Sequence, residues 1–166
     1  MLEGVTFHGL LNPAFPQDRL TTPFFNAIQE DGDRAHAALP SDTSPARSLA
    51  GRRILLVEDE AMIALDIELA LLDEGADVVG PVGELQRGLA ALDSERVIDA
   101  AILDVDLHGE DVYPIAERLK ARNVPFLFHT GHASREELTR RFGPVPVCTK
   151  PMLAEALVDA IGDLLA

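Results

Sequence analysis

The chain has 166 residues, of which 47% are hydrophobic, and this length allows one domain with a true core and a segment appended to it. Its formal net charge of −14 argues against nucleic acid or an anionic membrane surface as a partner, because both are bound through clustered Lys and Arg. The single cysteine, Cys148, excludes an internal disulfide and favours a cytoplasmic protein, and the sequence has neither a signal-peptide pattern nor an apolar run near the roughly 18 residues of a membrane span.

The first 50 residues differ from the rest of the chain, because they are rich in proline and lack a sustained hydrophobic period. The stretch "LPSDTSPARS" (39–48) has the composition of a linker. One short helix is predicted after Thr22, which can cap it, with Pro23 at the first helical position. We expect residues 1–50 to be an N-terminal extension that is disordered or partly helical. Its four phenylalanines leave two interpretations open, a disordered tail or a segment that buries aromatic rings against this domain or a partner.

From Arg52 onward the pattern is regular, and five apolar strands alternate with five helices. The predicted strands are 53–59, 76–82, 99–105, 124–130 and 145–150, and the predicted helices are 60–75, 83–94, 110–123, 134–142 and 153–165. Such alternation favours a parallel sheet with right-handed crossovers and helices on both faces. We therefore predict an α/β fold with a doubly wound, five-stranded parallel sheet, whose functional sites lie at the carboxyl ends of the strands.

Polar residues stand at those carboxyl ends. Glu58 and Asp59 follow the first strand, Asp104 ends the third, Thr130 ends the fourth and Lys150 ends the fifth. Carboxylates that converge on one edge repel each other unless a cation is present, so Mg²⁺ is the natural partner. The ammonium and the hydroxyl add donors suited to a phosphoryl group.

Each of these residues also has an ordinary explanation when taken alone. Asp59 or Glu60 could cap the following helix, Asp104 could be a loop carboxylate, and Lys150 could be a solvated surface charge. Their common position at the same end of different strands favours one shared site. Three histidines near this edge, His108, His129 and His132, could bind a metal or could be solvated or packed.

Four segments, "ILLVEDE", "AILDVDLHG", "FLFHTG" and "CTKP", resemble the signature segments of two-component response-regulator receiver domains. The resemblance covers residues 52–166, which we take as a receiver domain at 51–166. It implies a flavodoxin-like (βα)5 fold with strand order 2-1-3-4-5. It also implies that Asp104 is the phosphoacceptor and that Mg²⁺ is bound by Asp59, by Glu58 mainly through water, by Asp104, and by the backbone carbonyl of Asp106.

The resemblance further implies that Thr130 and Lys150 bind the phosphoryl group and that Gly131 and His132 begin a signalling loop. The "FHTGH" segment resembles a variant subgroup with Phe-x-Thr-Gly-aromatic, in which His132 takes the aromatic position. Two residues depart from the common pattern. Glu58 replaces the usual Asp, and Val147 replaces an aromatic residue.

A receiver of this kind is expected to accept a phosphoryl group from a histidine kinase or a histidine phosphotransfer protein. It would act on an unidentified downstream protein by contact, because no output domain follows the last predicted helix. It would not be an enzyme beyond its own phosphorylation and dephosphorylation. Two alternatives stay open: an aspartyl-phosphate-forming phosphatase, suggested by "DVD" at 104–106, and a degenerate receiver that only binds partners.

Overall fold

The computed structural model describes residues 48–94 and 97–166. The predictions for the extension, namely its linker, its short helix after Thr22 and its four phenylalanines, lie outside the described residues. No helix in the described ranges is both long and apolar enough to cross a membrane.

The strands form the predicted parallel sheet. They are β1 (Arg53–Val57), β2 (Asp77–Val82), β3 (Ala100–Asp104), β6 (Phe126–Thr130) and β7 (Val147–Thr149). All neighbouring pairs are parallel, and the order is β2-β1-β3-β6-β7. This is the flavodoxin-like order 2-1-3-4-5, so the predicted fold class is confirmed.

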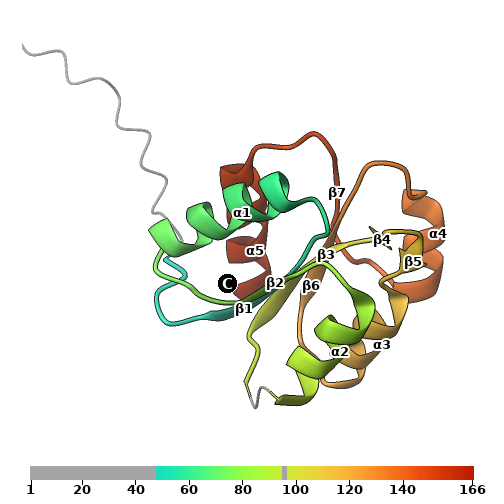
Figure 1. The fold of residues 1–166 in the computed structure, drawn as a ribbon, viewed down its shortest axis with the longest axis horizontal. Coiled ribbons are helices and arrows are strands. Elements are labelled where there is room, and N and C mark those ends of the chain that lie inside the picture. Colours follow the sequence, from blue (N-terminus) through green and yellow to red (C-terminus); the bar gives the residue numbers. More distant parts are fainter. Residues whose placement is uncertain (1–47, 95–96) are drawn as a thin grey trace, which may run out of the picture. The chain divides into compact units, whose positions relative to one another are not determined.

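Five helices cover the two faces of the sheet (Figure 1). They are α1 (Ala61–Asp73), α2 (Leu85–Ser94), α3 (Tyr113–Ala121), α4 (Arg135–Phe142) and α5 (Ala154–Leu165). Apolar residues of α1 and α5 pack in one core cluster, and those of α2, α3 and α4 pack in the other. The sheet is therefore buried on both faces, as continuous apolar strands predict.

The two clusters follow the period of two along each strand. In β1, Ile54 and Leu56 face the α1–α5 side, whereas Leu55 and Val57 face the opposite side. Leu49, which precedes the predicted start of the domain, is also buried in the α1–α5 cluster. The packed core thus begins before the first strand.

One part of the fold differs from the sequence prediction. The helix predicted from residue 110 begins at Tyr113, because β4 (Asp106–Leu107) and β5 (Glu110–Asp111) form a short antiparallel hairpin. Its two-residue turn has positive φ at both positions, 56° at His108 and 90° at Gly109. Such turns match the twist of a tight hairpin. The hairpin follows β3 directly, so it lies beside the carboxyl-terminal edge of the sheet, where the polar residues lie.

Candidate functional site

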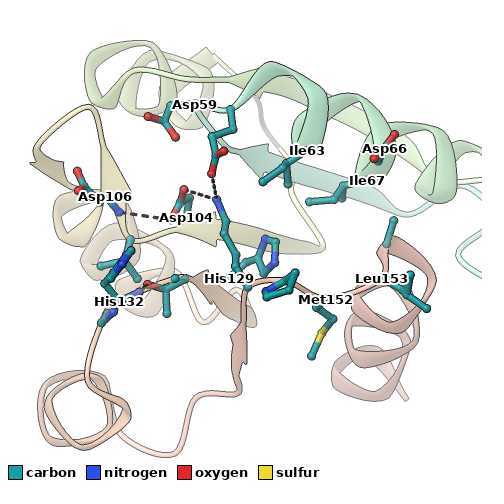
Figure 2. A pocket seen from close by; sticks show the side chains of 18 of the residues that line it. Asp59, Ile63, Asp66, Ile67, Asp104, Asp106, His129, His132, Met152 and Leu153 are labelled. Carbon is teal, nitrogen blue, oxygen red and sulfur yellow. Dashed lines mark hydrogen bonds and ion pairs between the residues drawn. The ribbon is translucent and has the colours of Figure 1, made fainter.

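The carboxyl ends of β1, β3, β6 and β7 meet at one edge of the sheet, and this edge opens into a pocket (Figure 2). Parallel strands bring these ends together whatever their distance in the sequence. Asp59, Asp104, Thr130 and Lys150 all line the pocket. The predicted convergence of residues from four strands therefore holds.

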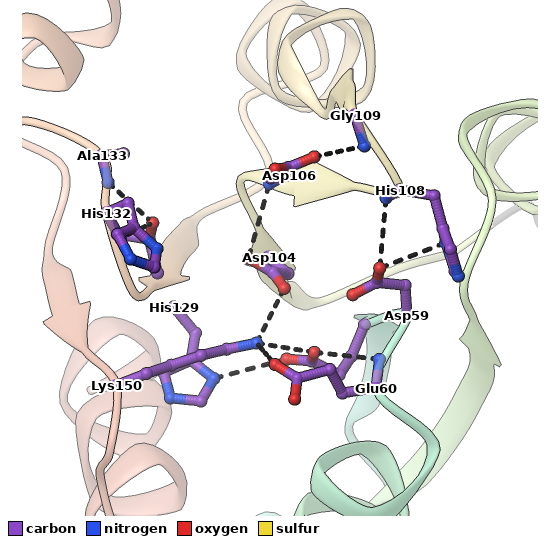
Figure 3. Close-up of polar contacts among 12 residues, drawn as sticks. Asp59, Glu60, Asp104, Asp106, His108, Gly109, His129, His132, Ala133 and Lys150 are labelled. Atoms are coloured by element: carbon purple, nitrogen blue, oxygen red, sulfur yellow. Dashed lines mark hydrogen bonds and ion pairs between the residues drawn. The ribbon is translucent and has the colours of Figure 1, made fainter.

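Lys150 is the centre of the site. Its Nζ atom lies 2.7 Å from Oδ2 of Asp104 and 2.7 Å from Oε1 of Glu58. It also lies 3.0 Å from Oε1 of Glu60 (Figure 3). The backbone N–H of Lys150 donates to the carbonyl of Thr130 at 2.9 Å, which fixes the lysine against β6. One ammonium group thus holds three carboxylates.

Burial and the neighbouring charges together shift the pKa values of Asp104, Glu58 and Lys150. It raises the pKa of Asp104 from 3.8 to about 6, since desolvation and the charge of Glu58 outweigh the hydrogen bond from Lys150. Burial also opposes ionisation of Glu58, but the nearby His129 ring and Lys150 ammonium outweigh it and lower the pKa of Glu58. Desolvation likewise disfavours the charged lysine, but its contacts with Asp104, Glu58 and Glu60 outweigh it and raise the pKa of Lys150. The site carries an excess of negative charge.

This donor set fits a hard divalent cation. Oxygens of Glu58, Glu60 and Asp104 lie within 4.8 Å of one another. One of the Glu58 oxygens, Oε2, is buried without a hydrogen-bond partner. Mg²⁺ is typically bound by carboxylate oxygens, and its charge would offset the excess negative charge of this cluster.

Asp59 and Glu60 make different contacts at this edge of the sheet, and the predicted role of Asp59 as a metal ligand stays a prediction. Oδ2 of Asp59 accepts a hydrogen bond from the backbone N–H of His108 at 3.1 Å and lies 3.1 Å from Nδ1 of the same residue. Asp59 therefore faces the hairpin turn. Glu60 contacts Lys150 instead. It occupies the N-cap position of α1, yet its side chain makes no capping hydrogen bond.

Asp106 shapes the hairpin. Its Oδ1 accepts a hydrogen bond from the backbone N–H of Gly109 at 2.6 Å. Its own backbone N–H lies 3.5 Å from Oδ1 of Asp104, the oxygen opposite to the one that contacts Lys150. The hairpin thus lies directly against Asp104. The predicted role of the Asp106 carbonyl as a metal ligand stays a prediction.

Thr130 is buried, and its hydroxyl is directed toward the following loop. Oγ1 accepts hydrogen bonds from the backbone N–H groups of His132 at 3.3 Å and Ala133 at 3.1 Å. Gly131 and His132 are exposed, and a Cβ atom on Gly131 would meet nothing within 4 Å. The loop after β6 is therefore tethered to the Thr130 hydroxyl by two backbone N–H groups and is exposed at Gly131 and His132, and its signalling role stays a prediction.

The three histidines near the edge differ in burial. The His108 side chain is 71% exposed, whereas that of His129 is only 2% exposed. Nδ1 of His129 lies 3.5 Å from Oε2 of Glu58 (Figure 3). The sequence indicated no specific role for His129, although the period of two in β6 places it on the same face as Leu127.

Comparisons with known proteins agree with this geometry. Residues 54–162 match the model of the response regulator receiver domain. The chain is 29% identical over 122 residues to the transcriptional regulatory protein PdtaR of Mycobacterium tuberculosis, a match that covers 72% of this chain and 59% of PdtaR. The chain thus spans less than two thirds of the length of that relative.

Solved structures are also similar. The solution structure of SdrG from Sphingomonas melonis Fr1 is 40% identical, with a TM-score of 0.59, and the match covers 70% of this chain and 98% of SdrG. The BeF3-activated conformation of SdrG from Pseudomonas melonis Fr1 matches with the same identity and coverage and a TM-score of 0.57. From the extent of the family match, together with the sheet order and the acidic site, we conclude that the chain belongs to the response regulator receiver domain family.

Proposed function

We propose that this receiver accepts a phosphoryl group on Asp104 from a histidine kinase or a histidine phosphotransfer protein, with Mg²⁺ as the cofactor. The observation that carries the proposal is the contact of Asp104 with Lys150 at 2.7 Å, in a cluster of carboxylates in which Asp104 and Glu58 are buried. This contact holds a nucleophilic carboxylate beside a cation that can also bind the transferred group.

The proposed reaction is a transfer between two protein side chains. A carboxylate oxygen of Asp104 attacks the phosphorus atom of a phosphohistidine. A P–O bond forms as the P–N bond breaks, and the imidazole nitrogen of the donor keeps the bonding electron pair. At neutral pH Asp104 is mainly ionised, because its pKa of about 6 lies below the working pH. The nucleophile is therefore available without a separate base.

The residues around Asp104 have distinct roles in this proposal. Glu58, Glu60 and Asp104 would hold Mg²⁺, with Asp59 and the Asp106 carbonyl as the further ligands that the family resemblance implies. Mg²⁺, when bound, supplies positive charge that offsets the carboxylates and the incoming phosphate. Lys150 keeps Asp104 oriented and stabilises charge on the phosphoryl oxygens.

The phosphorylated state would be read through the loop after β6. A phosphoryl group adds charge and three acceptor oxygens next to Thr130, whose hydroxyl holds the backbone of His132 and Ala133. Movement of that hydroxyl toward the phosphate would release the loop for contact with a downstream protein. The "FHTGH" segment supports the further proposal that the chain belongs to the Phe-x-Thr-Gly subgroup. The BeF3-activated conformation of a relative that is 40% identical supports a comparable change here.

The test is phosphorylation of the full chain by a small phosphodonor such as acetyl phosphate, followed by intact mass spectrometry. We expect one added phosphoryl group, lost in Asp104→Asn and in the presence of a chelator. Asp66→Asn is the matched control, because it removes an exposed carboxylate on α1 that makes no contact with Lys150 and keeps the proposed nucleophile. Incorporation that persists in Asp104→Asn would refute the assignment.

A further inference from the structure

His129 and Glu58 are buried side chains with polar atoms that lack hydrogen-bond partners. In the ranges that the structure describes, only three buried side-chain polar atoms lack a hydrogen-bond partner: Oε2 of Glu58 and the two ring nitrogens of His129. A buried polar group without a hydrogen-bond partner lowers the folding stability by about 1–3 kcal/mol. Such a group in a native structure therefore requires an explanation. Two of these atoms, Oε2 of Glu58 and Nδ1 of His129, face each other, so one contact can account for both.

The strand register explains why the two side chains meet. Asp104 pairs with His129 across β3 and β6, and Val57, the residue before Glu58, pairs with Leu103. Glu58, Asp104 and His129 therefore form the last row of the sheet on the α1–α5 face. The row beneath it is apolar and consists of Leu56, Ile102 and Leu127.

The two side chains reach toward each other across an intervening strand. Neighbouring strands lie about 4.8 Å apart, so β1 and β6 are separated by about 9.6 Å. The Glu58 side chain extends from β1 toward β6 and ends with Oε2 at 3.5 Å from Nδ1 of His129. An aspartate at position 58 would be shorter by one carbon–carbon bond, roughly 1.5 Å, and would not reach the ring.

The other oxygen of Glu58 already has partners. Oε1 accepts from Nζ of Lys150 at 2.7 Å and from the backbone N–H of Glu60 at 3.3 Å. The His129 ring is the group that stands beside Oε2. A glutamate side chain has one more rotatable bond than an aspartate side chain. Without the His129 ring, Oε2 of Glu58 would therefore be free to rotate.

We infer that His129 is a positioning residue: its Nδ1–H group donates to Oε2 of Glu58 and so fixes this carboxylate for the divalent cation. The 3.5 Å separation closes to a hydrogen bond with a shift of a few tenths of an ångström. Partners that orient a metal-binding carboxylate in this way typically change metal affinity by about 10- to 100-fold. This inference rests on the proposed Mg²⁺-dependent function.

The test is a double-mutant cycle on the full chain, read out by isothermal titration calorimetry with MgCl₂. His129→Leu removes the donor at similar volume, and we expect the Kd for Mg²⁺ to rise by about 10-fold. His129→Asn places an amide N–H near the position of Nδ1 and should restore most of the affinity. In a Glu58→Asp background the shorter carboxylate cannot reach residue 129, so His129→Leu should leave the Kd unchanged within about twofold.

The outcomes separate this inference from the proposed function. An equal loss of affinity in the unmodified and the Glu58→Asp backgrounds would show that His129→Leu acts through general packing, and an unchanged Kd in both backgrounds would show that the ring does not hold Glu58. Either result overturns the inference, while phosphorylation of Asp104 stays testable by mass spectrometry. Failure of the unmodified chain to bind Mg²⁺ would overturn the inference together with the metal requirement of the proposed function.

Discussion

Replacing Asp104 with asparagine should stabilise the metal-free protein, and the gain should depend on pH. Asp104 is only 6% exposed, and its pKa rises from 3.8 to about 6 because desolvation and the charge of Glu58 exceed the attraction of Lys150. This difference of about two pH units corresponds to about 3 kcal/mol of unfolding free energy lost when the carboxylate ionises in the folded state. Asparagine has nearly the same shape and cannot ionise, so it avoids that cost.

The sign of the pH dependence follows from the direction of the pKa change. Since the folded pKa lies above the unfolded value, the folded state binds more protons between pH 3.8 and about 6. The contribution of Asp104 to stability is therefore favourable at low pH and is lost as the pH rises through about 6. The advantage of Asp104→Asn over the unmodified protein should be about 3 kcal/mol at pH 7.5 and about 1 kcal/mol at pH 4.5.

The assay is urea unfolding in the presence of a chelator, followed by circular dichroism because the chain has no tryptophan. Asp66→Asn is the matched control, because Asp66 is an exposed carboxylate on α1 outside the contacts of Lys150. It should change the unfolding free energy by less than about 0.5 kcal/mol at either pH. An Asp104→Asn protein that is less stable than the unmodified chain at pH 7.5, or a gain that does not fall with pH, would refute the reasoning.

The contacts of Lys150 and Thr130 and the extent of the core lead to three more predictions. Lys150→Ala should lower the unfolding free energy by about 3 kcal/mol in chelator, because it leaves the buried carboxylates of Glu58 and Asp104 without their cation. Mg²⁺ should recover part of this loss, and urea unfolding with no measurable loss would contradict the prediction. Thr130→Val should speed amide hydrogen exchange at His132 and Ala133, whose N–H groups lose their acceptor, and unchanged protection there would show that the hydroxyl does not hold the loop. Deletion of residues 1–47 should leave a folded protein that acetyl phosphate still phosphorylates, because both core clusters form among the described residues; failure to fold would show that the extension completes the core.

The sheet and the location of the site could be predicted from the sequence, because both follow from the order of apolar runs and helical segments along the chain. Continuous apolar runs such as the one ending at Val57 define buried parallel strands, and the alternation with helices defines the layers. Once the strands are known, Asp104 and Lys150 must lie at the same edge, since parallel strands all end there. Their contact is a consequence of topology.

The details within the site depend on side-chain direction, which the pattern does not specify. Glu60 precedes α1 and looked like an ordinary cap, yet its carboxylate turns to Lys150. The Glu58–His129 contact joins residues that are far apart in the sequence, through two strand registers. The β4–β5 hairpin was missed because its arms have only two residues each and its turn is marked only by "HG".

The most direct test of the central claim is to locate the phosphoryl group on the chain. After reaction with acetyl phosphate and Mg²⁺, borohydride reduction converts an acyl phosphate into a stable residue that peptide mass spectrometry can assign. The proposal predicts a modified residue at Asp104 alone, absent when Mg²⁺ is chelated. A modification at another carboxylate, or stable phosphate on a histidine with Asp104 unmodified, would contradict it.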